Sequence, residues 1–397
     1  MKKTPKEELY RRIQALQKRM ESVNIDGALI VQNTDLFYFT GTIQQAYLFT
    51  PVSGEPVFLV RKNMARVKEE SFLNRIVTIE KLKDLPGLLV EHGYPQIKRI
   101  GMELDVLPAN LYFRYRDTLK PVEIVDIWPF IQAVRAIKSD YEINMLKDVA
   151  VLSDFMVNVG RENLREGLTD VELSSIVEGA ARARGHQGFV RTRAFNQEVY
   201  WGHLISGPDA ADPAFVDGTT GGHGLSHAFP HGSGWRHIRR NEPVIFDLLA
   251  AVHGYFIDQT RTFSLGPLPD KLDKAYNVAL DIQHKIGEMI HPGVSVAQLF
   301  LKAEQIAQSH GLGEHFMGHG NEQLSYCGHG IGLELDEFPV IAKQGKTLLS
   351  PGMVVALEPK FHFPKEGVVG VEDTFVVTDK GNRKLTGASY VVDVIPR

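Results

Sequence analysis

Four carboxylates lie inside or beside apolar runs that are typical of buried β-strands. Asp247 ends the run PVIFD, Asp258 opens DQTRTF, and Glu358 and Glu372 lie within MVVALEPKF and VVGVEDTFVV. A buried carboxylate is costly unless it is paired with a proton or a cation. These segments can therefore be buried only if a proton or a cation lies close to their carboxylates.

The first two carboxylates belong to a predicted β-hairpin, whose strands are separated by the turn candidate Val252-His253-Gly254. If Val252 and His253 form the tip, residue 247 faces residue 258. The Cβ atoms of Asp247 and Asp258 would then lie roughly 4.5 to 5.5 Å apart. Two anions held this close repel each other unless a proton or a divalent cation lies between them.

A second predicted hairpin turns at Pro364-Lys365-Glu366-Gly367. Glu358 and Glu372 are symmetric about Lys365, so they too would face each other across the hairpin. Gly367 can take a positive φ in a bulged loop. The two hairpins therefore present two pairs of carboxylates.

Between the hairpins lies the segment Gly328-His329-Gly330-Ile331-Gly332, whose glycines let the backbone come close to a ligand. One imidazole and four carboxylates suit Mn, Co, Fe or Zn. Two such ions bridged by carboxylates can activate a water and polarise a carbonyl. The predicted metal ligands are Asp247, Asp258, His329, Glu358 and Glu372.

Four segments, in this order, resemble the successive motifs of the metallopeptidase family that contains prolidase, aminopeptidase P, methionine aminopeptidase and creatinase. They are FDLLAAVHGYFIDQTRTF, GHGIGLELDEFP, GMVVALEPKF and GVEDTFVVTDKG. The resemblance implies the pita-bread fold, a curved antiparallel sheet flanked by helices, with two divalent ions (Mn, Co, Zn or Fe) per subunit. It also implies that Asp258 and Glu372 bridge both ions, that Asp247 binds one ion, and that His329 and Glu358 bind the other.

The same resemblance implies hydrolysis of the Xaa-Pro amide bond in dipeptides or at the N-terminus of longer peptides. Glu358 would carry a proton to the leaving nitrogen, and the free amino group would bind a metal or an acid such as Asp258. Thr260 and Thr374 are expected to hydrogen-bond near the ligands. Other expectations concern packing: Arg261 pairs with acids, and Cys327 is a small buried filler.

The chain is predicted to have two domains, because 397 residues exceed one ordinary core. Residues 1–132 are predicted to form an α/β domain, because strand candidates alternate there with helical stretches. The strand candidates are ALIV, AYLFT, PVFLV, RIVTIE, KRIGME and VEIVD, and the helical stretches lie near residues 63–73, 83–92 and 107–118. This part, including LFYFTGT, resembles the creatinase and prolidase N-terminal domain, whose role implies a homodimer. We expect a linker at residues 128–139 and the pita-bread domain over 133–397. Helices there are expected to begin at the capping boxes of Ser139, Thr169 and Ser295.

Composition excludes several function classes. The chain has 44 basic and 48 acidic residues, so no basic field suggests nucleic acid. Its single cysteine excludes an internal disulfide, and no apolar run approaches the roughly 18 residues that span a membrane. The charged N-terminus lacks the apolar core of a signal peptide. We therefore expect a cytoplasmic protein, and the family resemblance implies an enzyme whose partner is a small peptide substrate.

Residues 202–240 are rich in Gly, His and Pro and are predicted to form an extended loop. Family peptidases place a substrate-contacting His in a Pro-His-Gly phrase, which corresponds here to His231. However, SGPDAADPAF also resembles the stretch leading to that His, and this alignment puts Ala214 at the position. His231 is the predicted catalytic residue of the loop, with His203, His223 and His227 as alternatives.

Two positions depart from the family pattern. A second catalytic His is replaced by Asp336, which could stabilise an oxyanion only if it were protonated. An Arg that is common in prolidase-like members is replaced by Gly370, which puts dipeptide selectivity in doubt. These departures leave two alternatives open. One is a non-peptide hydrolase or lyase, as in creatinase or a sulfonium lyase, and the other is a catalytically weak metal-binding homologue.

Overall fold

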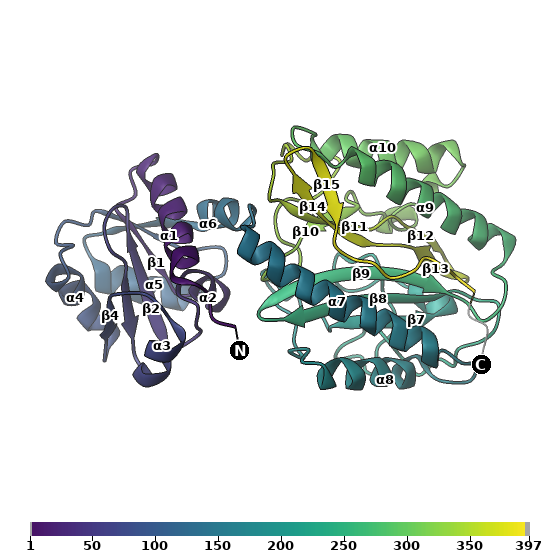
Figure 1. Cartoon of the computed structure of the whole chain (residues 1–397), viewed down its shortest axis with the longest axis horizontal. Helices are drawn as coiled ribbons and strands as arrows, with labels where there is room; N and C mark the ends of the chain where they lie inside the picture. The colour runs from purple at the N-terminus through teal and green to yellow at the C-terminus, as the bar shows by residue number, and fades with distance from the viewer. Residues whose placement is uncertain (1, 394–397) are drawn as a thin grey trace. The chain divides into compact units, whose positions relative to one another are not determined.

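A computed structural model describes residues 2–393 of the chain. The chain divides into two compact units, Met1–Arg135 and Ala136–Arg397 (Figure 1). No helix in the described part of the chain is both long and apolar enough to cross a bilayer.

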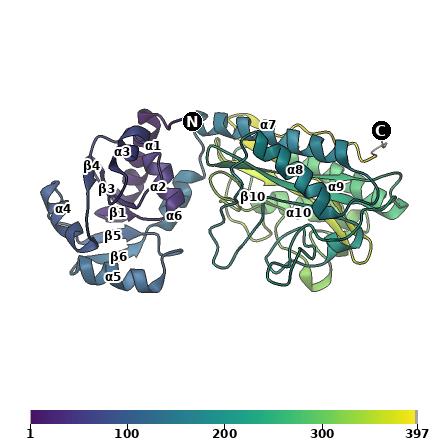
Figure 2. The ribbon, with the colours of Figure 1, turned by 90° about the horizontal axis from the view of Figure 1, so that it is seen from below.

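The first unit is an α/β domain built on one six-stranded mixed sheet in the order β4-β3-β2-β1-β5-β6. All six predicted strands are present: β1 Gly27–Ile30, β2 Ala46–Pro51, β3 Val57–Val60, β4 Ile76–Thr78, β5 Arg99–Met102 and β6 Glu123–Asp126. The helices are α1 Lys6–Glu21, α2 Asn33–Thr40, α3 Met64–Glu70, η1 Leu82–Asp84, α4 Leu85–Glu91, α5 Ala109–Leu119 and α6 Trp128–Arg135. Helices α4 and α5 pack on one face of the sheet, and α1 and α2 contact β2 from the other (Figure 2).

The predicted linker at residues 128–139 is wrong in its first part. Residues Trp128–Arg135 form helix α6, which contacts α1 and belongs to the first unit. Its apolar residues Ile131 and Val134 are buried, so the segment is held by packing. The proline at position 129 fits because the first turn of a helix needs no backbone N–H donor.

The second unit is built from antiparallel sheets covered by helices. Its strands are β7 Gly202–Ser206, β8 Val244–Val252, β9 Tyr255–Phe263, β10 Gly328–Gly330, β11 Val354–Leu357, β12 Lys360–Phe363, β13 Gly367–Gly370, β14 Asp373–Thr378 and β15 Gly381–Lys384. They form three sheets, β7-β8-β9, β10-β11-β14-β15 and β12-β13. The long helices are α7 Asp140–Asn163, α8 Asp170–Ala183, α9 Asp270–Met289 and α10 Val296–Ser309. Short turns η2 Gly207–Ala211, η3 Gly313–His315 and η4 Gly320–Glu322 complete the unit.

The helices of the second unit cover the sheets from outside. Helix α7 crosses β8 and β9, while α9 packs on β12, β13 and β15 (Figure 1). Helices α7, α8 and α10 begin at the three predicted capping boxes. The side chains of Ser139 and Thr169 accept the backbone N–H three residues on, and that of Ser295 accepts the N–H of Ala297. The backbone N–H of each cap residue donates in return to the side chain three residues on. The predicted antiparallel sheets with flanking helices are therefore confirmed.

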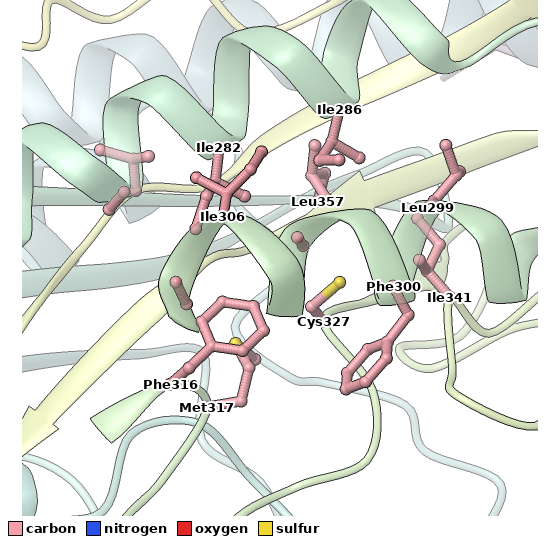
Figure 3. Packing of buried hydrophobic residues seen from close by; sticks show 14 of the residues in the cluster. Ile282, Ile286, Leu299, Phe300, Ile306, Phe316, Met317, Cys327, Ile341 and Leu357 are labelled. Carbon is pink, nitrogen blue, oxygen red and sulfur yellow. The ribbon is translucent and has the colours of Figure 1, made fainter. Parts of the chain in front are cut away.

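The main core of this unit lies between helices α9 and α10 and the strands beneath them. Its members include Ile282, Ile286, Leu299, Phe300 and Leu357 (Figure 3). Cys327 lies within this cluster, and burial raises the pKa of its thiol. It is the small buried filler that the sequence predicts.

His186, just after α8, is held neutral in a buried position. Its Nε2 lies 2.9 Å from the Leu249 carbonyl oxygen, and its Nδ1 accepts the Gly188 N–H at 2.9 Å. The ring also packs on Trp201, with centroids 3.9 Å apart. Burial lowers the pKa of His186 from 6.5 to about 4.

The free energy of unfolding of the second unit is therefore expected to fall as the pH falls from 6.5 towards about 4. Over this range His186 is protonated in the unfolded chain but stays neutral in the folded one, so the proton stabilises the unfolded state. His186→Gln keeps a donor for the Leu249 carbonyl but does not titrate, so its unfolding free energy should fall less over this range. Urea unfolding at several pH values measures the difference. Equal losses in both proteins would contradict the assignment.

Candidate metal centre

The first hairpin places two of the predicted ligands on one face of the β8-β9 sheet, but not directly opposite each other. Asp247 faces Thr260, and Asp258 faces Leu249. The predicted pairing of residue 247 with residue 258 is therefore wrong by two residues, and the carboxylates are diagonal neighbours.

The tip of the hairpin explains the error. Val252 pairs with Tyr255, so the two-residue turn is His253-Gly254 and not Val252-His253. His253 has φ +56° and Gly254 has φ +88°. Positive φ at both central residues is the type I′ turn, whose twist matches that of antiparallel strands. Moving the tip by one residue moves every cross-strand partner by two.

The second hairpin has the predicted register. Lys360 faces Gly370 in β12-β13, and Leu357 faces Asp373 in β11-β14. Both pairs are symmetric about Lys365, so Glu358 and Glu372 lie at matching positions between the two paired stretches. Both side chains are buried.

His329 lies on β10 and reaches the carboxylates of both hairpins. Its Nε2 is 3.9 Å from Asp258 Oδ2, 3.9 Å from Glu358 Oε1 and 3.6 Å from Glu372 Oε1. Its Nδ1 lies 3.1 Å from the Gly330 carbonyl oxygen, so the neutral ring, which is the form that binds a metal ion, carries its proton on Nδ1. The Nε2 lone pair is then free to bind a cation.

The donors at this position suit a divalent metal ion. Ligand atoms of Asp258, His329 and Glu372 all lie within 4.8 Å of one another. Asp258 Oδ1 and Glu372 Oε1 are buried, and neither has a hydrogen-bond partner among the described residues. Buried carboxylate oxygens without partners are costly, and a cation bound among them would satisfy both.

Asp247 is not one of these mutually close ligands, and its carboxylate pairs with a lysine instead. Lys360 Nζ is 2.9 Å from Asp247 Oδ2, 3.0 Å from Glu358 Oε2 and 3.8 Å from Glu372 Oε2. The side chain is fully buried. Sequence reasoning missed Lys360, although side chains two residues apart in an extended segment share a face, so its spacing from Glu358 was a signal.

The crowding of charge at the site shifts several pKa values. Burial and neighbouring Glu372 raise the pKa of Asp258 well above its ordinary value. Burial lowers the pKa of His329, but the carboxylates of Asp336, Glu372 and Glu358 outweigh it and raise that pKa strongly. Burial also raises the pKa of Glu358, while Lys360 opposes the rise. The site is therefore rich in buried anions that favour any bound cation.

Two further pKa values reflect the pairing of Asp247 with Lys360. Burial raises the pKa of Asp247, but Lys360 and His203 outweigh it, so the pKa is lowered. Burial lowers the pKa of Lys360, but Asp247, Glu358 and Glu372 outweigh it and raise that pKa well above its ordinary value. Both groups are therefore charged at neutral pH.

Threonine hydroxyls hold the carboxylates in place. Thr219 donates to Glu358 Oε2 at 2.6 Å, and Thr220 donates to Asp247. Thr260 donates to Glu372 Oε2 at 2.8 Å, and Thr374 donates to the backbone carbonyl of Asp258 at 3.0 Å. The last two are the residues expected from the sequence, whereas Thr219 and Thr220 were missed because they come from the loop.

The predicted loop over residues 202–240 begins with a strand. Residues Gly202–Ser206 form β7, are buried throughout, and pair with β8, which places His203 opposite Asp247. This correction has a simple cause: HLIS is a short apolar run that the neighbouring glycines and prolines obscured. The remainder of the segment is irregular apart from the short turn η2.

Of the loop histidines, His203 and His231 lie at the site. Both line the pocket that contains Asp247, Asp258, His329 and Glu358. Their rings are 4.2 Å apart, and burial lowers the pKa of both. His231 Nε2 lies 2.9 Å from the Thr220 carbonyl oxygen, while its Nδ1 has no partner among the described residues.

The other candidates of this segment lie elsewhere. His223 is exposed and paired with Asp212, and His227 is exposed. Ala214 lines a different pocket, with Met317 and His362. None of the three lines the pocket of the metal centre.

Asp336 lies beside His329 at the mouth of the pocket. Its Oδ1 is 3.5 Å from His329 Nδ1, and its Oδ2 accepts from Gln197 at 3.0 Å. The neighbouring Glu337 is engaged with Lys138 at 3.0 Å. The second departure, Gly370, faces Lys360 across β12-β13, so the lysine stem occupies the space beside it.

Arg261 lies behind the centre and joins β9 to the segment that carries Glu372. Its guanidinium donates to the carbonyl oxygens of Glu372 at 2.7 Å and Ala388 at 2.8 Å, and to Asp373 Oδ1 at 2.8 Å. It is fully buried, as the predicted pairing with acids requires.

Comparison with known proteins identifies relatives over nearly the whole length. An Xaa-Pro dipeptidase of Pyrococcus horikoshii is 29% identical over 92% of this chain and 94% of its own. The structure of an Xaa-Pro dipeptidase from Bacillus anthracis matches with a TM-score of 0.83 at 25% identity, covering 97% of this chain and 99% of that one. A prolidase from Pyrococcus furiosus matches with a TM-score of 0.78 at 26% identity, over 94% and 99% of the two chains.

Two family models match the two units. The model of the creatinase/prolidase N-terminal domain matches residues 12–137. The model of metallopeptidase family M24 matches residues 144–379, which is more than half of the chain and includes all five predicted metal ligands. With the pita-bread fold shared with the prolidases, the chain belongs to metallopeptidase family M24.

Proposed function

We propose that this protein is a metal-dependent peptidase that hydrolyses the amide bond before proline, in Xaa-Pro dipeptides or at the N-terminus of longer peptides. The observation that carries the proposal is the buried group of Asp258, His329 and Glu372, whose ligand atoms lie within 4.8 Å of one another, with Asp258 Oδ1 and Glu372 Oε1 lacking a hydrogen-bond partner among the described residues. The relatives named Xaa-Pro dipeptidase supply the substrate class.

A divalent ion bound among these ligands would activate water and polarise the substrate carbonyl. Oxygen and imidazole donors suit Mn, Co, Zn or Fe, and Mn is the ion that we propose. The sequence predicts two ions. Asp258, His329, Glu358 and Glu372 would hold one of them, and Asp247 is the ligand expected to bind only the other.

Glu358 is the residue that we propose to move the proton. Burial raises its pKa although Lys360 opposes the rise, and a carboxylate with a raised pKa is a better proton acceptor. Its Oε2 already accepts hydrogen bonds from Thr219 and Lys360, while its Oε1 faces His329. The proton would pass from the attacking water to the nitrogen of the leaving proline.

His231 and Asp336 are proposed to position the substrate. Neutral His231 has its proton on Nε2, towards the Thr220 carbonyl, so its Nδ1 can accept a hydrogen bond from a substrate N–H. Asp336 lines the same pocket and presents a carboxylate near His329, which suits a free amino group better than an oxyanion.

We also propose that the protein is a cytoplasmic homodimer. The large exposed apolar side chains of the catalytic unit include Phe195 and Trp235, which are 92% and 67% exposed, and exposed aromatic residues are common at protein interfaces. Light scattering after gel filtration would test the dimer, and a monomeric mass at micromolar concentration would contradict it.

The peptidase proposal is tested by loading the full chain with Mn²⁺ or Co²⁺ and measuring cleavage of Ala-Pro, Met-Pro, a longer Xaa-Pro peptide and matched peptides without proline. We expect cleavage of proline-containing substrates only, and its loss after removal of metal by a chelator. If the metal-loaded protein cleaved none of them, the peptidase proposal would fail and non-peptide chemistry on this scaffold would take its place.

A further inference from the structure

The two carboxylate oxygens of Glu358 and of Glu372 face different sides of the site. One oxygen of each faces the predicted metal position beside His329, and the other faces the ammonium group of Lys360. The Oε1 atoms face His329 Nε2 at 3.9 and 3.6 Å, whereas the Oε2 atoms face Lys360 Nζ at 3.0 and 3.8 Å. Asp258 lies on the histidine side and Asp247 on the lysine side. The ammonium group of Lys360 therefore occupies the oxygens that an ion at Asp247 would need.

The lysine is built into this position. Lys360 is fully buried on β12 and faces Gly370 on β13. A Cβ atom at Gly370 would lie 2.6 Å from Lys360 Cγ and 2.7 Å from the Pro359 carbonyl oxygen. The lysine stem therefore fills the space that a side chain at position 370 would take. Thr219 also accepts a hydrogen bond from Nζ, at 2.7 Å.

The charge of the site also favours one ammonium and one metal ion. Two divalent ions would by themselves balance the carboxylates of Asp247, Asp258, Glu358 and Glu372. With Lys360 buried among the same groups, a second divalent ion at Asp247 would leave an excess positive charge and compete with the ammonium group for the same carboxylate oxygens. Like charges buried this close repel strongly.

We propose that Lys360 is a built-in cation that takes the place of the second metal ion, so that this protein binds one divalent ion, at Asp258, His329, Glu358 and Glu372. Asp247 is then a partner of the lysine and not a metal ligand. The inference rests on the metal centre of the proposed function, but it concerns the number of ions and can be measured without any substrate.

The test is the amount of Mn²⁺ retained by the full chain, by elemental analysis and by calorimetric titration. We expect about one ion per chain for the wild type and about two for Lys360→Met, because methionine keeps the apolar stem but lacks the ammonium group. The second ion should bind the variant at least about tenfold more tightly than it binds the wild type. Lys360→Arg keeps the charge and should stay near one ion.

A second variant identifies the ligand of the new ion. Adding Asp247→Asn to Lys360→Met should return the count to about one, because it removes the carboxylate that the lysine had paired. The wild type gives an independent measurement that needs no variant to fold. Its bound Mn²⁺ should show the six-line electron paramagnetic resonance spectrum of an isolated ion.

Three results would overturn the inference. One is two tightly bound ions in the wild type, another is a multiline spectrum from coupled Mn²⁺ ions, and the third is an unchanged count in folded Lys360→Met. The absence of any bound ion from all proteins would be a different failure, because it would remove the metal centre of the proposed function itself.

Discussion

Glu358→Gln is expected to lower kcat for an Xaa-Pro substrate by about 10² to 10⁴-fold, the usual contribution of a positioned acid and base. The amide cannot take the proton from water or return it to the leaving nitrogen. It does keep one oxygen, which can accept from Thr219 as Glu358 Oε2 does, while its NH2 group takes the place of the Oε1 atom that faces His329. Steady-state kinetics of the metal-loaded variant measure the loss, and elemental analysis shows whether metal is retained.

Glu366→Gln is the matched control for this change. Glu366 lies at the turn of the same hairpin, is 41% exposed and pairs with Lys271 on the surface. Its substitution should leave kcat within about twofold, since such surface pairs contribute little. A folded Glu358→Gln protein that retains its metal and turns over at the wild-type rate would remove the proton role from Glu358.

Arg261→Met is expected to lower the free energy of unfolding of the catalytic unit by about 3 to 5 kcal/mol, the cost of breaking a buried charge pair from one side. The substitution leaves Asp373 buried beside an apolar side chain. It also leaves the carbonyl oxygens of Glu372 and Ala388 without their donor. Urea unfolding followed by the fluorescence of Trp201 and Trp235, both in this unit, measures the loss.

Lys285→Met serves as the control for Arg261. Lys285 is 52% exposed and pairs with Asp281 one turn earlier on α9, so its loss should cost less than about 1 kcal/mol. The double variant Arg261→Met with Asp373→Asn should lose less than the sum of the two single losses, because neither partner is left charged alone. Strict additivity of the two losses would show that the pair is not coupled.

The hairpins show how far sequence could predict the site. The second hairpin has its turn fixed by Pro364 and Gly367, and its register was predicted correctly. The first has one ambiguous position at its tip, because both Val252-His253 and His253-Gly254 are two-residue candidates. Only the second gives positive φ to residues that tolerate it. The residue preferences of the type I′ turn therefore decide the register of the first hairpin.

Features that depend on distant parts of the chain were less predictable. Thr219 and Thr220 belong to an irregular segment that hydrogen-bonds to Glu358 and to Asp247, which are distant in sequence, and no local pattern specifies these contacts. Lys360 was overlooked for another reason, because a charged residue within an apolar run is ordinarily assigned to the solvent face. The spacing of Lys360 from Glu358 contradicted that assignment, because residues two apart in an extended segment share a face. Lys360 was therefore predictable as a buried cation beside the carboxylates of that face.

The consecutive hydroxyls of Thr219 and Thr220 have a consequence for how the site is assembled. They belong to the wall of the substrate pocket, yet they donate to Glu358 and Asp247, whose oxygens also serve the cations. The threonines of the pocket wall and the bound cations therefore share the same carboxylate oxygens. Binding of a peptide at the pocket wall and binding of the metal ion are then thermodynamically linked. Reciprocity then requires that a peptide which orders this wall change the affinity for the metal by the same factor by which the metal changes the affinity for the peptide.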